Sequence, residues 1–232
     1  MKEDLDFYLQ YNGSVKVSEM TKMDLKNLIQ TGESSFLEFK HQVASPEKIA
    51  REIAAFANTK GGTILIGVSD NGEMVGVEGY FEEEFLLNQA ASEECIPAVA
   101  ISIEMLHVGD RDILIVKVPE SDSKPVYVKG KKTRLVYIRQ DDESIVASDE
   151  WIELLKNNDS DEGVTFEYGE REQKLFRFLN EYGSITVDRF ALLISVTTYR
   201  AAKILVNLVS AGVLDLFDKE GVAHYTFSQK SS

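Results

Sequence analysis

The sequence predicts an α+β protein of two modules, in which a mixed sheet with helices is followed by a smaller unit of helices and a β-hairpin. Three observations support this prediction. Apolar patterns of both helix and strand type occupy residues 20–156. Residues 157–163 are polar and acidic and end in glycine, as a flexible linker requires. The charge changes at the same place, because residues 1–162 carry 17 basic and 31 acidic side chains, whereas residues 163–232 carry 8 of each.

The composition is that of a folded protein without disulfides. Of its residues, 44% are hydrophobic and 28% are charged, which excludes wholesale disorder and low-complexity classes. The one cysteine, Cys95, has no intrachain partner and no apolar leader follows Met1, so we expect a cytoplasmic location. The longest apolar stretches, such as residues 64–68, are only strand-sized, and we expect no membrane partner.

The first half of the large module follows residues 1–19, whose weak pattern leaves their structure open. Pro46 suits the first position of a helix, and an apolar stripe runs from there to Asn58. Asn71-Gly72 is a strong hairpin signal, so we expect the chain to return there and pair with the strand before the turn. The predicted elements are a helix at 22–30, a strand at 36–39, a helix at 46–58, an inner strand at 63–68 and the return strand at 74–77.

The second half of the large module is richer in strands. Two alternating runs are joined by the turn Gly109-Asp110-Arg111 and predict another hairpin. Ser148 is a suitable N-cap for a closing helix. The predicted elements are a helix at 81–94, strands at 99–108, 112–118, 125–128 and 135–139, and a helix at 149–156.

The small module has the element order of a winged helix-turn-helix, a fold whose third helix can enter a major groove. Its predicted elements are helices at 170–182, 186–194 and 197–210, then hairpin strands at 213–217 and 222–227. The predicted organisation is an N-terminal segment at 1–19, an α+β domain at 20–156, a linker at 157–163 and a winged helix-turn-helix domain at 164–232.

Three blocks of sequence resemble one known family. They are Glu33-Ser34-Ser35-Phe36-Leu37-Glu38-Phe39-Lys40, Ala55-Phe56-Ala57-Asn58-Thr59-Lys60-Gly61-Gly62 and Gly67-Val68-Ser69-Asp70-Asn71-Gly72. With Pro97, Pro125 and Tyr137-Ile138-Arg139, they resemble the Schlafen-type Alba-like (AlbA_2) domain over about residues 20–150. The resemblance implies a Schlafen/Alba-like mixed sheet that binds nucleic acid. In bacteria such domains are often followed by a winged helix and described as transcriptional regulators.

The same family has also been described as a divergent ATPase. Here Gly62 and Gly67 are followed by Val68-Ser69, where a Walker A loop requires Lys and Ser or Thr. We therefore expect no nucleotide hydrolysis and no nucleotide cofactor.

The resemblance also implies a candidate catalytic site. Glu33, Glu38 and Asp70 match a carboxylate trio of the eukaryotic Schlafen nucleases. Three convergent carboxylates can hold Mg²⁺ or Mn²⁺, which polarises a phosphodiester and activates water. Lys40 shares a strand face with Glu38 and could contact phosphate. The alternative is that Glu38 and Lys40 form only same-face ion pairs in a domain that binds without cutting.

A local run of cations interrupts the acidic module. Between Ser123 and Gln140 there are six basic side chains and no carboxylate; we call this set the basic island. Its members are Lys124, Lys129, Lys131, Lys132, Arg134 and Arg139. Interleaved with Tyr127 and Tyr137, they could follow a nucleic-acid backbone and stack a base, or they could be an ordinary solvated loop.

The third helix of the small module predicts a second binding surface. Its apolar stripe leaves five polar side chains toward solvent, namely Thr197, Thr198, Arg200, Lys203 and Asn207. Arg and Asn can read guanine and adenine in the major groove. The hairpin adds only Lys219, beside Asp218 and Glu220, so a protein-docking role for this module stays open.

The sequence thus predicts a nucleic-acid-binding protein, and more specifically a DNA-binding transcription regulator that binds without turnover. The alternatives are a metal-dependent endoribonuclease that uses Glu33, Glu38 and Asp70, and a protein-interaction adaptor, which the net charge of −14 favours. DNA and RNA are the expected partners. Palindromic recognition also favours a homodimer.

Overall fold

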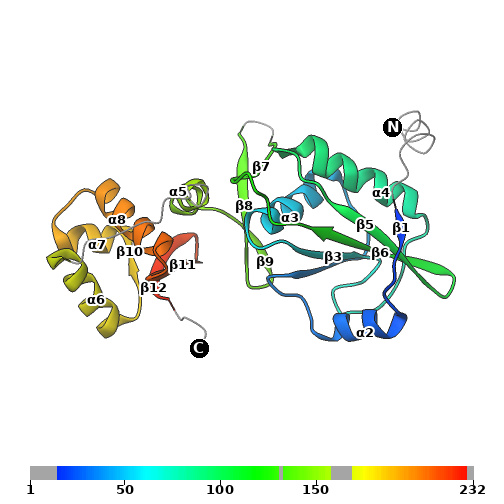
Figure 1. Cartoon of the computed structure of the whole chain (residues 1–232), viewed down its shortest axis with the longest axis horizontal. Coiled ribbons are helices and arrows are strands. Elements are labelled where there is room, and N and C mark those ends of the chain that lie inside the picture. Colours follow the sequence, from blue (N-terminus) through cyan, green and yellow to red (C-terminus); the bar gives the residue numbers. More distant parts are fainter. Residues whose placement is uncertain (1–14, 131–132, 158–168, 229–232) are drawn as a thin grey trace. The chain divides into compact units, whose positions relative to one another are not determined.

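The computed structural model describes residues 15–130, 133–157 and 169–228 (Figure 1). Contacts divide the chain into two compact units, Met1–Val146 and Ala147–Ser232. Residues 131–132 of the basic island and most of the predicted linker at 157–163 lie outside the described residues. Within the described ranges, no single helix is both long and apolar enough to cross a membrane, and one adjoining pair meets that test only across a bend of 109°.

The first unit contains a mixed five-stranded sheet in the order β1-β5-β6-β3-β2. Strand β3 lies inside this sheet, parallel to β2 on one side and antiparallel to β6 on the other. Its residues Ile64, Leu65 and Ile66 are fully buried, as the continuous apolar run predicts. The strands are β1 Lys16–Val17, β2 Leu37–Lys40, β3 Gly62–Ile66, β5 Ser102–Val108 and β6 Arg111–Val118.

A second, four-stranded sheet in this unit has the order β4-β7-β8-β9. The helix α3 (Pro46–Asn58) packs against its strands β7 and β8, and it also contributes Ile53 and Phe56 to the core that includes Ile64 and Ile66 of β3. The strands are β4 Cys95–Ile96, β7 Tyr127–Val128, β8 Leu135–Gln140 and β9 Glu143–Val146. Helix α3 therefore joins the two sheets.

Two further helical segments complete the first unit. Helix α2 (Lys22–Gln30) buries Leu25 and Ile29 against a core that includes Leu65 of β3. Because Leu65 alternates with Ile64 and Ile66, α2 covers the face of the sheet opposite to α3. Helix α4 (Tyr80–Gln89) continues directly into the π-helical turn η1 (Ala90–Glu94).

The Ala-Phe-Ala-Asn-Thr-Lys-Gly-Gly block closes α3 and starts β3. The buried side chain of Asn58 donates to the carbonyls of Val126 and Tyr137, both at 2.9 Å, and accepts from the Val126 N–H at 2.7 Å. At Gly62 a Cβ atom would lie 2.3 Å from the Phe56 ring, so only glycine fits. These residues fix the end of α3 against both sheets.

One predicted pairing is wrong. Residues 74–77 do not form a return strand against β3; only isolated bridges occur there, such as Val68 with Met74. The turn forms, with Gly72 at φ +79°, but both edges of β3 are already paired, with β2 and β6. The local turn signal was correct, whereas the pairing partner depended on strands far away in the sequence.

The second unit contains α5 to α8 and a three-stranded sheet in the order β10-β12-β11. Its core includes Leu175, Phe190, Leu205 and Tyr225. The elements are α5 Asp149–Asn157, α6 Glu170–Tyr182, β10 Ile185–Thr186, α7 Val187–Ile194, α8 Thr198–Ser210, β11 Leu214–Lys219 and β12 Val222–Phe227. Helices α6 to α8 and the hairpin follow the order that the sequence predicts.

Helix α5 lies in the second unit, whereas the sequence places it at the end of the domain at 20–156. Leu154 belongs to the core of the second unit, Trp151 packs against that core, and α5 contacts α8. The apolar side of α5 is covered by α8, which comes more than forty residues later in the chain. The polarity of residues 157–163 therefore did not indicate which unit holds the helix before them.

Candidate nucleic-acid interface

Arg139, the last member of the basic island, is buried in the first unit. It is 4% exposed, and its guanidinium donates to Glu38 at 2.8 Å, to Ser144 Oγ at 3.1 Å and to the Ser34 carbonyl at 2.6 Å. Its Cζ also lies 4.7 Å from the centre of the Phe56 ring. The structure contradicts the prediction that Arg139 contacts nucleic acid, because its side chain holds β8 to β2.

The other acidic partner of Arg139 is Glu52 of α3, at 3.4 Å. The Ser144 hydroxyl also donates to Glu52. The buried Glu38 and Arg139 thus form an ionic network with the half-buried Glu52, which joins three elements, β2, α3 and β8. Burial makes such a network costly to disrupt, since removal of one charge leaves its partner unpaired.

The predicted carboxylate trio surrounds one end of this network without forming a metal site. Glu38 is 6% exposed and pairs with both Lys40 and Arg139, which confirms that Glu38 and Lys40 share a face. Glu33 accepts the Phe39 N–H at 2.8 Å, and Asp70 is exposed. In the part of the chain that the structure describes, no group of three His, Cys, Asp or Glu side chains is arranged to hold a metal ion. The geometry does not support a shared Mg²⁺ or Mn²⁺ site at Glu33, Glu38 and Asp70.

These groups nevertheless influence one another electrostatically. The pKa of Glu33 is raised mainly by burial, and the charges of Glu38 and Asp70 raise it further. The Phe39 N–H bond and the Lys40 charge oppose this shift. The folded structure therefore disfavours the ionised form of Glu33.

The fold leaves only some of the described cations of the basic island exposed and unpaired. Lys124 donates to the Thr59 carbonyl at 2.9 Å and pairs with Glu120, so its charge is neutralised. Lys129 and Arg134 are exposed. Lys131 and Lys132 lie outside the described residues. Tyr137 is buried in the core and Tyr127 is partly buried. Of the four island cations that the structure describes, Lys129 and Arg134 are therefore placed for contact with a ligand.

In contrast, the predicted face of α8 is formed as expected. Thr197, Thr198, Arg200, Lys203 and Asn207 are all exposed, whereas Ala201, Leu205, Val206 and Leu208 are buried. The Thr197 side chain caps the helix by accepting the Arg200 N–H at 3.4 Å. The sequence correctly identified which side of α8 faces solvent.

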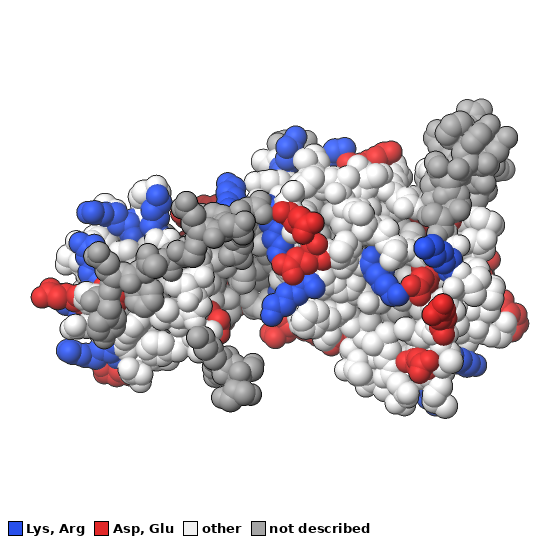
Figure 2. All heavy atoms as spheres, in the orientation of Figure 1, with Lys and Arg blue, Asp and Glu red and all other residues white. Residues whose placement is uncertain are grey.

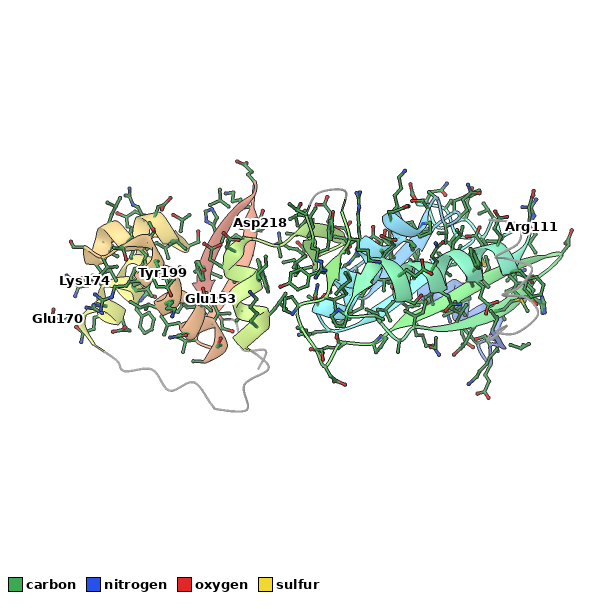
Figure 3. All side chains as sticks on the ribbon, turned by 90° about the horizontal axis from the view of Figure 1, so that it is seen from above. Arg111, Glu153, Glu170, Lys174, Tyr199 and Asp218 are labelled. Atoms are coloured by element: carbon green, nitrogen blue, oxygen red, sulfur yellow. The ribbon has the colours of Figure 1, made fainter. Side chains whose placement is uncertain are left out.

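Tyr199 is a member of this face that the prediction missed. It is 67% exposed, and Lys203 Nζ lies 5.2 Å from its ring centre; Figure 3 labels it on α8. A hydrogen bond with Tyr199 is the main cause that raises the pKa of Lys203. The spacing of four residues could have revealed this pair. Glu52 and Ser144 gave no such signal, because their shared partner Arg139 lies in another element.

The β11–β12 hairpin contributes little positive charge. Lys219 is exposed between Asp218 and Glu220, and Asp218 accepts the Gly221 N–H at 2.8 Å within the turn. On the face in view, Figure 2 shows Lys and Arg side chains in separate groups, several of them beside Asp and Glu. Among the described residues visible on that face, Lys and Arg form no single continuous patch.

The family model for "Schlafen, AlbA_2" matches residues 33–148, half of the chain. The chain belongs to this family. Domains of the AlbA_2 family are associated with nucleic-acid binding. The matched residues contain both the Arg139 network and the exposed Lys129 and Arg134.

Two solved structures are similar to the chain. The N-terminal domain of a RecG-related protein from Nitrosomonas europaea has 25% identity and a TM-score of 0.42, and the match covers 56% of this chain and 92% of that one. A protein from Corynebacterium diphtheriae has 15% identity and a TM-score of 0.44; the match covers 98% of this chain and 39% of that one. The search of curated proteins gives no match.

Proposed function

We propose that the protein is a cytoplasmic, DNA-binding transcription regulator whose second unit is a winged helix-turn-helix. The observation that carries this proposal is the exposed face of α8, on which Arg200, Lys203 and Asn207 stand together. The arrangement of α6, α7 and α8 followed by the β11–β12 hairpin supports it, since the third helix of this motif enters the major groove.

The chemistry of the face suits base recognition. Arginine binds guanine O6 and N7 in a bidentate manner, and asparagine does the same with adenine N6 and N7. Arg200 and Asn207 are seven residues apart, which is about two helical turns, and so lie on the same side of α8. Lys203, between them, can neutralise a phosphate. Lys129 and Arg134 of the AlbA_2 domain would add backbone contacts.

In the first step of the test, the full chain is incubated with a pool of random duplex DNA, and the sequences that it binds are enriched. Fluorescence anisotropy on the enriched duplex then compares the wild type with Arg200→Ala. We expect about tenfold or greater loss of affinity, because a bidentate arginine–guanine contact discriminates by about 1–3 kcal/mol. Arg171→Ala, at an exposed position in the first turn of α6, removes the same charge and is the control. Absence of any enriched sequence, or equal affinities of the two variants, would overturn the proposal.

A further inference from the structure

A hollow in the first unit lies beside the start of α3 and is lined by several cations. Its polar lining comes from Lys40 at the end of β2, Gln42, Lys48, Arg51 and Glu52. Lys48 and Arg51 are exposed, and Lys40 is half-buried. None of the four described members of the basic island lines this hollow.

The carboxylates at the hollow are already matched by cations. Glu52 is held by the buried Arg139, and Lys40 pairs with Glu38 at the rim of the same network. Among the described residues, neither Lys48 nor Arg51 forms an ion pair. The hollow therefore presents two unneutralised positive charges on a protein whose net charge is −14.

The surroundings of the two free cations also favour an anion. The guanidinium of Arg51 lies over the ring of Tyr137, 5.9 Å from its centre, which restricts its side chain. Lys48 is in the first turn of α3, where the aligned peptide dipoles add positive potential. Glu47, in the same turn, is exposed and does not line the hollow.

We propose that this hollow binds a phosphate group, which Lys48 and Arg51 contact directly. Arginine and lysine are the side chains that recognise phosphate, arginine through its planar fork and lysine as a point charge. The phosphate is one unit of a nucleic-acid backbone or belongs to a free nucleotide. The site itself does not depend on the role of α8; it rests on the proposed function only for nucleic acid as the source.

The experiment compares two double variants of the full chain that remove the same charge. Lys48→Gln/Arg51→Gln alters the hollow. Lys26→Gln/Lys60→Gln alters exposed positions on α2 and beyond the opposite end of α3. Binding of a labelled single-stranded DNA oligonucleotide is measured by anisotropy at several salt concentrations. Because both side chains contact one phosphate, their loss should reduce the log–log salt slope by about 0.7 and weaken binding about tenfold at low salt.

Two further measurements identify the molecule that supplies the phosphate group. They also separate the phosphate-site proposal from the proposed DNA binding by α8. Inorganic phosphate and a nucleoside monophosphate are titrated into ¹⁵N-labelled protein, and we expect the amide signals of Lys48 and Arg51 to move in the wild type. A monophosphate that binds as tightly as the oligonucleotide identifies a nucleotide as the natural ligand, and tighter binding of the oligonucleotide identifies the backbone; both results support the site. Arg200→Ala should leave these shifts unchanged, whatever its effect on duplex DNA.

The proposal is overturned if the hollow variant binds the oligonucleotide with the affinity and salt slope of the control variant, or if phosphate moves no amide signal near Lys48. Thermal unfolding of both double variants checks that the fold is intact. We expect the two double variants to unfold at the same temperature, because all four substituted side chains are exposed.

Discussion

Arg139 and Arg200 are the same residue type in two different situations. Arg139 closes a run of six cations in the sequence, yet it is 4% exposed and bound to two carboxylates. Arg200 stands without a neighbouring run, yet it is exposed on α8. A run of charges along the sequence is therefore a poor guide to the charge that a partner would meet.

The difference arises from the elements that carry the two residues. On α8 the period of 3.6 residues separates a buried from an exposed side within one local segment, so the sequence alone defines the face. On β8 the environment of Arg139 is made by residues 101 and 87 positions away, Glu38 and Glu52. No local pattern contains that information.

The largest effect that this comparison predicts is on stability. Arg139→Ala should lower the free energy of unfolding of the first unit by about 3 kcal/mol, because the buried Glu38 keeps only Lys40 as a cationic partner and the half-buried Glu52 loses its cation. Urea denaturation measures it. The matched control is Arg134→Ala, five residues earlier and exposed, which should change stability by less than about 0.5 kcal/mol. Equal stability of the two variants would show that Arg139 is not a structural cation.

A smaller effect concerns the pH dependence of stability. Glu33 has a pKa raised by burial above its ordinary value of 4.5, so its ionised form weakens the fold. This cost is present in full above the folded pKa and is relieved as pH falls through it. Glu33→Gln, which keeps an acceptor for the Phe39 N–H, should therefore be more stable than the wild type at pH 7, and the gain should shrink toward pH 4.5.

Glu104 provides the opposite case for the same measurement. Its pKa is lowered, first by a hydrogen bond with Lys117 and then by one with Ser18 at 2.7 Å. Glu104→Gln should therefore be less stable than the wild type at pH 7. This difference in the free energy of unfolding should disappear as pH falls below 4.5, the ordinary pKa of glutamate, and through the lowered pKa of Glu104. Urea denaturation from pH 7 down to well below 4.5, the ordinary pKa of glutamate, compares the two variants. Parallel curves would contradict both assignments.

Most elements of the fold could be predicted from the sequence, because caps and apolar periods are local. The bounds of α2, α3 and α6 agree with the prediction, down to Pro46 at the start of α3. The sequence did not predict β9 or β10, which are short, or the lack of a return strand after Gly72. Strand β10 and the missing return strand depend on the edges of strands distant in the sequence, whereas β9 pairs with the preceding β8 across the turn at Asp141-Asp142 and was simply missed.

The candidate site divides in the same way. The exposed side of α8 follows from helical spacing. The exposure of the basic island does not follow from local spacing. Lys124 pairs with Glu120 and donates to the Thr59 carbonyl, and Arg139 is buried against Glu38. The hollow at Lys48 and Arg51 was also missed, because its lining comes from β2 and α3 together and only the folded chain brings them to one place.

The central claim is that a cation contributes to nucleic-acid binding only where the fold leaves it free. Lys124 and Arg200 test it most directly, because the first belongs to the basic island but is paired and the second is isolated in sequence but exposed. The measurement is the dissociation constant for duplex DNA of Lys124→Ala and Arg200→Ala across a salt series. We predict affinity and salt slope close to the wild type for Lys124→Ala, and a loss of about tenfold for Arg200→Ala. A loss for Lys124→Ala equal to or larger than that for Arg200→Ala would contradict the account.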